Sequence, residues 1–244
     1  MARDETKEGG EVRQLDLVPR PVAAAPDGID LRCCDVAELL DEVEGASLVV
    51  ADPPWSYRNA GAEGNADTQY ELLTNAAILE HVDEAYTSAS ENAYLALWCT
   101  WPKLDEWMTC AHLGASRPSP WLRWSYVSGG AWTKSHGLGV GFHWRGDSEP
   151  LLLYRKGKPR ALATASNAHA TPRRLILHSE KPLSWARDHV RAWCPPGGLV
   201  LDLYAGMAPY ARACHLEGRR YIGAEIDPKR HADALGLLAQ VRND

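Results

Sequence analysis

The sequence predicts an α/β fold built on a doubly wound, mostly parallel sheet. Its apolar runs, such as residues 46–52 and 198–206, are continuous rather than alternating, which is typical of strands buried on both faces. These runs alternate with segments of helical periodicity, an order that favours parallel strands joined by helices. A chain of 244 residues with 45% hydrophobic side chains can bury one substantial core. We therefore expect a single domain over residues 29–244, preceded by a polar, flexible leader over residues 1–28.

Seven segments are predicted to be strands. They span residues 29–34, 46–52, 92–99, 121–134, 149–157, 198–206 and 219–226. The second strand stops abruptly, because Pro53 and Pro54 cannot continue a central ladder of backbone hydrogen bonds. Asp52 is therefore predicted to mark the carboxyl edge of the sheet.

Helices are predicted between these strands from their start and stop signals. They cover a short stretch after Asp35, residues 74–90, 101–114, 181–193 and 208–217, and a terminal helix from Pro228. Thr74 is a predicted N-cap, while Pro102 and Gly114 suit the first turn and the end of one helix. Residues 58–70 and 160–174 lack periodicity and are predicted to be loops.

The charge of the chain is unevenly distributed. Residues 1–116 carry 7 basic and 22 acidic side chains, whereas residues 117–174 carry 10 basic and 2 acidic ones. This asymmetry predicts a localised polyanion-binding face in a basic loop region at about residues 145–174. The phosphate contacts are predicted to come from Arg155, Lys156, Lys158, Arg160, Arg173 and Arg174. The alternative is a solvated basic loop.

The cysteines give no sign of a metal site. They stand at positions 33, 34, 99, 110, 194 and 214, with no C-x-x-C pair and no zinc-finger spacing. We expect reduced thiols in a cytoplasmic protein and no bound metal. No run of about eighteen apolar residues occurs, so we expect no membrane span. The polar N-terminus also lacks the apolar stretch of a secretory signal.

A strand, a glycine turn and a helix follow one another over residues 202–213. Open α/β sheets bind ligands at such carboxyl ends, and Gly206 lets the backbone approach a ligand closely. Tyr204 and Gly206 are therefore predicted to lie against a nucleotide-like cofactor. About twenty residues further on, Glu225 ends a strand where an acidic side chain suits a pair of ribose hydroxyls. The turn alone is a weak signal, because Ala208 replaces the usual second glycine.

The sequence Asp52-Pro53-Pro54-Trp55 is a sharper signal. The exocyclic amine of adenine is a poor nucleophile, because its lone pair is delocalised into the ring. Hydrogen bonds to the Asp52 carboxylate and the Pro53 carbonyl would free that lone pair to attack a methyl sulfonium in line. The paired prolines would fix the carbonyl, and Trp55 is predicted to stack on the base. The alternative is a proline-terminated strand followed by a core tryptophan.

These segments together resemble the N6-adenine methyltransferase family, which includes the catalytic subunit of the eukaryotic messenger-RNA adenosine methyltransferase and prokaryotic β-class DNA adenine methyltransferases. The resemblance spans about residues 29–239. The matching stretches are CCDVAELL, VVADPPW, AWTK, EPLLLYRKGKPR, HSEKP, DLYAG and GRRYIGAEIDP. They follow a circularly permuted order, with the catalytic motif first and the glycine turn last. The resemblance implies a Rossmann-like fold of the methyltransferase type, with S-adenosylmethionine as cofactor.

The resemblance also implies roles toward that cofactor. Asp35, with Cys34 beside it, would contact the adenine of the cofactor, and Glu225 would take its ribose hydroxyls. Asp52 would lie close to its methionine amino group. Lys181 would reach its carboxylate or hold the active-site loop.

On the substrate side the resemblance adds Tyr70, in the loop after the catalytic motif, and Lys134 of AWTK. The compact chain favours adenine in DNA, flipped out of the duplex, with adenine in RNA as the alternative. A hypothesis of another class is a catalytically silent, nucleic-acid-binding partner subunit, against which the presence of Asp52 argues. The resemblance favours a prokaryotic or phage-encoded protein. The oligomeric state stays open, with a homodimer or a heterodimer among the alternatives.

Overall fold

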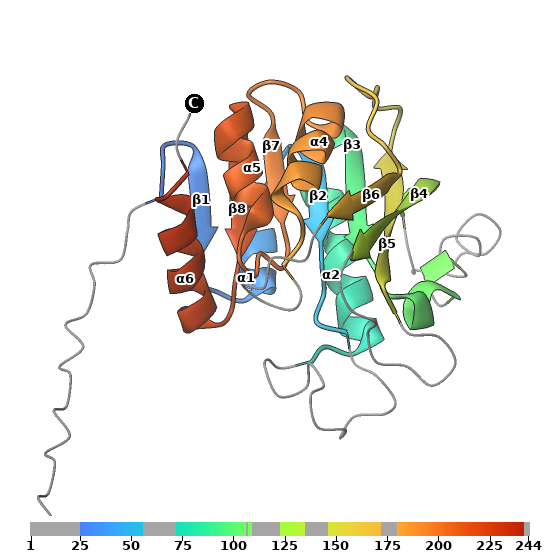
Figure 1. Cartoon of the computed structure of the whole chain (residues 1–244), viewed down its shortest axis with the longest axis horizontal. Coiled ribbons are helices and arrows are strands. Elements are labelled where there is room, and N and C mark those ends of the chain that lie inside the picture. The colour runs from blue at the N-terminus through green and yellow to red at the C-terminus, as the bar shows by residue number, and fades with distance from the viewer. Residues whose placement is uncertain are drawn as a thin grey trace, which may run out of the picture.

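One eight-stranded sheet forms the centre of the structure (Figure 1). The computed structural model describes residues 25–55, 72–105, 107–108, 123–134, 146–171 and 180–241. Within these ranges the strands lie in the order β1-β8-β7-β2-β3-β5-β4-β6. Neighbours in the sheet are therefore mostly distant in sequence, as expected where helices connect parallel strands.

The strands are β1 (Ile29–Arg32), β2 (Ala46–Ala51), β3 (Ala89–Trp98), β4 (Ser125–Lys134), β5 (Ser148–Lys156), β6 (Ala168–Thr171), β7 (Leu199–Asp202) and β8 (Arg220–Ala224). The helices are α1 (Val36–Leu40), α2 (Asn75–Ser88), α4 (Leu183–Trp193), α5 (Pro209–Glu217) and α6 (Pro228–Leu238), with a 3₁₀ turn, η2 (Trp101–Lys103).

The direction of β5 decides which residues share an edge of the sheet. Strands β1, β8, β7, β2 and β3 are all parallel, whereas β5 runs antiparallel to β3 and to β4. The prediction of a mostly parallel sheet is confirmed. Because β5 is reversed, its first residues lie at the same edge of the sheet as the carboxyl ends of β2 and β3, and its last residues lie at the opposite edge.

Helices cover both faces of the sheet, which makes the fold doubly wound. Helices α4, α5 and α6 lie over one face, and α1 and α2 lie over the other (Figure 1). Along β2, Leu48 and Val50 join the core on the first side, and Val49 and Ala51 join the core on the second. A strand buried on both faces needs a continuous apolar run, which is the pattern that predicted it.

Local capping explains where several helices begin. Thr74 is the N-cap of α2 and accepts a hydrogen bond from the backbone amide of Ala77 at 3.2 Å, which confirms the predicted cap. Asp227 caps α6 in the same way through the amide of Arg230 at 2.8 Å.

Two predicted segments differ from the structure. The loop expected over residues 160–174 contains β6, which pairs in parallel with the end of β4. Its sequence Ala-His-Ala-Thr has no apolar run, so only backbone pairing with β4 makes it a strand. The helix expected from residue 101 begins instead as the 3₁₀ turn η2, with Pro102 in its first positions.

Of the expected leader, only residues 25–28 lie within the described ranges, and they are tied to the sheet. The Ile29 amide donates to the Pro26 carbonyl at 3.1 Å, and the Tyr221 amide donates to the Gly28 carbonyl at 2.9 Å. In the described part of the chain, no helix has the length and apolar character needed to cross a membrane.

Candidate functional site

The predicted cofactor residues line one edge of the sheet. Strands β1, β8, β7 and β2 are parallel neighbours, so their carboxyl ends meet there. Residues 34–35 follow β1, Glu225 follows β8, residues 204–206 follow β7, and Asp52 follows β2. The topology thus brings together side chains that are up to 191 positions apart along the chain (34 to 225).

The glycine turn after β7 is held by Glu225. The Gly206 amide donates to Glu225 Oε2 at 2.9 Å, and the Asp227 amide donates to Oε1 at 2.9 Å. Gly206 has φ +54°, a conformation that glycine adopts at little cost. A Cβ added to Gly206 would meet no atom of the described residues within 4 Å, so the turn faces open space. Ala208 takes a similar left-handed φ of 51° at the start of α5, where the usual motif has glycine.

A buried carboxylate lies just beneath this turn. Asp202 ends β7 and is 2% exposed; it accepts hydrogen bonds from the Tyr221 hydroxyl at 3.1 Å and, more weakly, from the Tyr204 amide at 3.4 Å. Burial raises the pKa of Asp202 to about 7, although both hydrogen bonds oppose that shift. Gly223 leaves room for the Tyr221 ring, because a Cβ there would collide with the phenol.

The other cofactor candidates are partly exposed at the same edge. Asp35 is the N-cap of α1, where its carboxylate accepts from the Ala37 amide at 2.8 Å. Cys34 is half-buried beside it. The Tyr204 hydroxyl is hydrogen-bonded to His81 Nδ1 at 2.9 Å, which links the turn after β7 to α2.

The Asp-Pro-Pro-Trp turn leaves the sheet at the end of β2. The Pro54 carbonyl accepts from the Leu73 amide at 3.0 Å, which holds the turn in place. Trp55 is 6% exposed and packs edge-to-face on Trp107, with ring centroids 5.5 Å apart. This is the packing role that the alternative interpretation of Trp55 expected. Stacking of Trp55 on a base remains a prediction.

Asp52 is one of four charged residues that form a chain of ion pairs. We call these four residues the charged cluster: Asp52, Lys181, Glu149 and Lys134. Lys181 Nζ lies 2.7 Å from Asp52 Oδ2 and 3.1 Å from Glu149 Oε2, and Lys134 pairs with the other oxygen of Glu149. The Lys181 side chain is only 7% exposed, and its ammonium lies 5.0 Å from the centre of the Trp98 ring. Of the two predicted roles of Lys181, these contacts favour the one of holding the Asp-Pro-Pro-Trp turn in place over the one of binding a cofactor carboxylate.

The charged cluster shifts the protonation of its members. Burial raises the pKa of Asp52 above its ordinary value; the charge of Lys181 opposes this, and that of Glu149 adds to it. Burial alone would lower the pKa of Lys181, but the two carboxylates outweigh it and raise the pKa. Burial alone would raise the pKa of Glu149, but Lys181 and Lys134 outweigh it and hold the pKa below its ordinary value. Lys181 is therefore a fixed cation, while the pKa of Asp52 is shifted upward and that of Glu149 downward.

Glu149 is the residue of this site that the sequence analysis missed. An acidic residue just inside a buried strand, in a basic stretch of the chain, was the available signal. Glu149 belongs to the site only because β5 is antiparallel and starts at the edge of the sheet where Asp52 lies. Lys134, predicted to bind substrate, reaches this edge too, but its ammonium is paired with Glu149.

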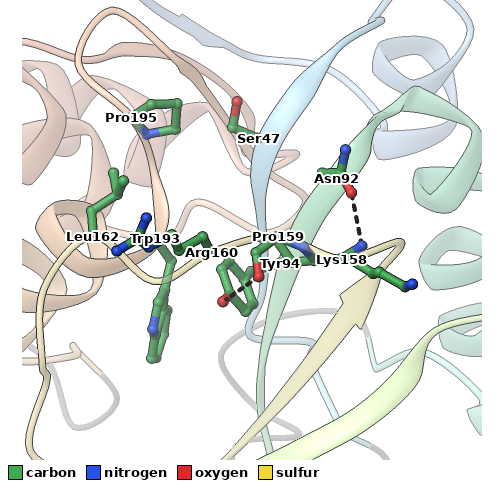
Figure 2. A pocket seen from close by; sticks show the side chains of 9 residues that line it. All are labelled: Ser47, Asn92, Tyr94, Lys158, Pro159, Arg160, Leu162, Trp193 and Pro195. Atoms are coloured by element: carbon green, nitrogen blue, oxygen red, sulfur yellow. Dashed lines mark hydrogen bonds between the residues drawn. The ribbon is translucent and has the colours of Figure 1, made fainter.

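The basic residues in the last part of β5 and directly after it lie at the opposite edge of the sheet. Arg155 is paired with Tyr94 near the start of β3, and the chain continues away from Asp52. Lys158 and Arg160 line a pocket together with Trp193 (Figure 2). The volume of this pocket is about 240 Å³. The pocket includes Ser47 at the amino end of β2, so it is separated from Asp52 by the length of that strand. The direction of β5 therefore places Arg155, Lys158 and Arg160 away from Asp52. That these residues contact phosphates stays a prediction.

Lys156, another predicted phosphate contact, makes several contacts within the protein. Its ammonium donates to the carbonyls of Tyr86 and Ala89, both at 2.7 Å, and lies 4.6 Å from the centre of the Tyr86 ring. It therefore satisfies carbonyls at the end of α2, where a cation is favoured. Tyr70, Arg173 and Arg174 lie outside the described residues.

Comparison with known proteins agrees with this architecture. A sequence profile described as DNA methylase, of the N6/N4 methyltransferase type, matches residues 46–235. No curated protein matches the sequence.

Several solved structures share the fold at low sequence identity. The M1.HpyAVI–SAM complex superposes with a TM-score of 0.64 at 15% identity, covering 86% of this chain and 99% of the other. The cytosine-N4-specific PvuII DNA methyltransferase gives a TM-score of 0.67 at 12% identity, with 91% and 89% covered. TTHA0409 of Thermus thermophilus, a putative DNA modification methylase complexed with S-adenosyl-L-methionine, gives 0.60 at 20% identity, with 86% and 93% covered. Because the profile matches well over half of the sequence, the chain belongs to the N6/N4 family of DNA methylases.

Proposed function

We propose that the protein transfers a methyl group from S-adenosylmethionine to N6 of adenine in DNA. The observation that carries this proposal is the placement of Asp52. Asp52 directly follows β2, and its carboxylate lies 2.7 Å from the Lys181 ammonium. It borders the strand ends that carry the cofactor candidates. An acceptor fixed in this way is suited to an amine that gains positive charge as it reacts.

The residues at the edge of the sheet fit S-adenosylmethionine. The open space before Gly206 permits close approach of a ligand to the backbone. Each Glu225 oxygen already accepts one backbone amide and has a second lone pair for a ribose hydroxyl. Ile226, beside it, is 60% exposed and offers an apolar surface for the adenine of the cofactor. The carboxylates of Asp35, Asp52 and Glu225 suit a cationic ligand.

The bound cofactor would supply a methyl group attached to a positively charged sulfur. The leaving group would be the neutral thioether that remains after the methyl group is transferred. Asp52 and the Pro53 carbonyl would accept the two N–H groups of the adenine amine, so that its lone pair points at the methyl carbon. The new bond joins N6 to that carbon, and the amine must then lose one proton. The raised pKa of Asp52 makes its carboxylate a suitable acceptor for that proton before release to solvent.

Lys181 and Glu149 would keep Asp52 in this geometry. The lysine holds Oδ2 and leaves Oδ1 for the amine, while Glu149 helps to keep the buried ammonium charged. Such fixed partners avoid reorganisation during the reaction.

Cytosine N4 is a second candidate target. The likeness to a cytosine-N4-specific enzyme is at least as close, by TM-score, as that to M1.HpyAVI. The exocyclic amine of cytosine needs the same two acceptors. We favour adenine because of the Asp-Pro-Pro-Trp sequence at residues 52–55.

Either base must leave the duplex to reach a carboxylate at a sheet edge. Extrusion costs a few kcal/mol, least where pairing is weak. We therefore expect single-stranded or mismatched DNA to be methylated at least as well as a perfect duplex.

The proposal is tested by labelled methyl transfer from S-adenosylmethionine to matched DNA and RNA, followed by mass spectrometry of the nucleosides. N6-methyladenine in DNA, lost in Asp52→Asn, is the expected result. N4-methylcytosine would move the target to cytosine, and N6-methyladenosine confined to RNA would overturn the choice of DNA. No product from any substrate, with the protein folded and bound to nucleic acid, would favour the silent partner subunit.

A further inference from the structure

Trp101 is an exposed aromatic ring at the same edge of the sheet as Asp52. It follows β3 by three residues, in the 3₁₀ turn η2, and is 48% exposed. Six other tryptophans of the described residues are at most 6% exposed, at positions 55, 98, 107, 124, 132 and 185, and Trp193 is half-buried. A large ring left in solvent forgoes much hydrophobic stabilisation, which makes this position unusual for a purely structural residue.

The ring of Trp101 is oriented before any ligand binds. Its indole N–H donates to Ser148 Oγ at 3.0 Å, and Pro102 restricts the backbone directly after it. The turn is closed by a hydrogen bond from the Lys103 amide to the Thr100 carbonyl at 2.9 Å. A ring held in this way loses little further freedom when it stacks on a partner.

Short contacts connect Trp101 to the catalytic carboxylate. Ser148, which holds the indole, precedes Glu149, and Glu149 shares Lys181 with Asp52. The register places Leu97 beside Ala51, so Trp98 is level with Asp52 and Trp101 lies just beyond it.

The strand order places Trp101 on the substrate side of Asp52. The cofactor candidates follow β1, β8 and β7, on one side of β2, whereas β3 and β5 lie on the other side. In-line displacement requires the amine to approach the methyl carbon from the side opposite the sulfur. With the cofactor on the β7 side, the base must therefore enter from the side of β3 and β5, where Trp101 lies.

We infer that Trp101 is the aromatic surface on which the nucleobase that enters beside Asp52 stacks. This inference rests on the proposed function and adds to it a substrate-binding residue. Stacking on an exposed indole does not depend on base identity, so it holds for adenine and for cytosine alike. Removing a base–aromatic stack is expected to raise KM for DNA about 10-fold or more, and kcat little, because the contact exists in ground and transition states.

The kinetic test compares Trp101→Phe with Trp101→Leu. Phe keeps an aromatic face, whereas Leu keeps apolar volume without one. We expect Leu to raise KM about 10-fold and Phe to recover most of it, with S-adenosylmethionine affinity unchanged in both. Leu162→Ala is the matched control, because Leu162 is 52% exposed in the pocket at the opposite edge. Equal KM values for the Leu variant and the wild type would overturn the inference, as would equal defects in Leu and Phe.

A binding test separates this inference from the proposed function. Short single-stranded DNA carrying 2-aminopurine, whose fluorescence falls on stacking, is mixed with the protein and S-adenosylhomocysteine. We expect quenching by the wild type and Trp101→Phe, and much less by Trp101→Leu. The quenching does not require methyl transfer. An inactive wild type would therefore refute the proposed function, while the quenching would still test whether the base stacks on Trp101. Undiminished quenching by folded Trp101→Leu, or a change in oligomeric state without a change in quenching, would overturn the stacking role.

Discussion

Lys181 Nζ lies 2.7 Å from Asp52 Oδ2, although the two residues are 129 positions apart along the chain (52 to 181). The contact joins a residue two positions before the start of α4 to the residue directly after β2. Glu149 completes it from the start of β5, so three segments fix one carboxylate. This relationship makes the stability of the site depend on the charge of Lys181.

Lys181→Met should destabilise the protein, because it leaves Asp52 and Glu149 facing each other without their shared cation. Breaking a buried pair costs about 3–5 kcal/mol, and the 30% exposure of Asp52 reduces our expectation to about 2–3 kcal/mol. Both carboxylates would then have raised pKa values, so the deficit should shrink as pH falls and they become protonated. Urea unfolding at neutral and acidic pH measures this. Lys181→Arg is the control that keeps the charge, and an equal loss in Arg and Met would show that shape rather than charge matters.

Asp52→Asn should remain folded and lose methyl transfer by about 100-fold or more, since an amide is a weaker acceptor for the amine and cannot take its proton. Thermal unfolding checks the fold, and labelled methyl transfer checks the activity. Asp52→Glu is a useful companion, because it keeps the charge but moves the carboxylate. Near-wild-type turnover by Asp52→Asn would remove this carboxylate from the mechanism.

Asp202→Asn should change the pH dependence of stability. The folded pKa of Asp202 is about 7 against an ordinary value of 3.8, so the unfolded state releases this proton at lower pH. Wild-type stability should therefore fall as pH rises from about 4 to about 7, and the neutral Asn variant should lack that loss. The free energy of unfolding of the variant relative to wild type should rise by on the order of 2–4 kcal/mol between pH 5 and pH 8. A pH-independent difference would contradict the raised pKa.

Gly206→Val should abolish binding of S-adenosylmethionine, because its side chain would fill the space before the turn. Gly218→Val is a matched control: Gly218 also has a positive φ and open space around its Cβ, but it ends α5 before β8. Both variants should lose a similar amount of stability from backbone strain, while only Gly206→Val loses cofactor affinity. Calorimetry with S-adenosylmethionine decides this, and unchanged affinity in folded Gly206→Val would take the turn out of the site.

Lys156→Met should lower stability by about 1–2 kcal/mol, because two carbonyls near the end of α2 lose their donor. Its affinity for DNA and the salt dependence of that affinity should stay at wild-type values. Lys158→Met, two residues on and exposed, should leave stability unchanged. A flatter salt dependence in Lys156→Met at unchanged stability would restore the phosphate contact that the structure argues against.

The sequence by itself determined the strands other than β6, and the turns that follow β2 and β7. Apolar runs identify β2 and β7 because a strand buried on both faces has few polar residues, a property of the segment alone. Pro53 and Gly206 identify the turns because each imposes its backbone conformation locally. Parallel order then follows from the alternation with helices, and it places Asp52 and Glu225 at one edge.

Only the tertiary structure decided which charges and rings reach that edge. The direction of β5 is set by pairing with β3 and β4, and it brings Glu149 to Asp52 while it carries Arg155 and Lys158 to the opposite edge. A local pattern contains no information on strand direction, because an apolar run is the same in either orientation. The exposure of the tryptophans was also decided by the tertiary structure. Trp55 is buried against Trp107, whereas Trp101 is exposed. The residues next to each of them in the sequence do not predict this difference.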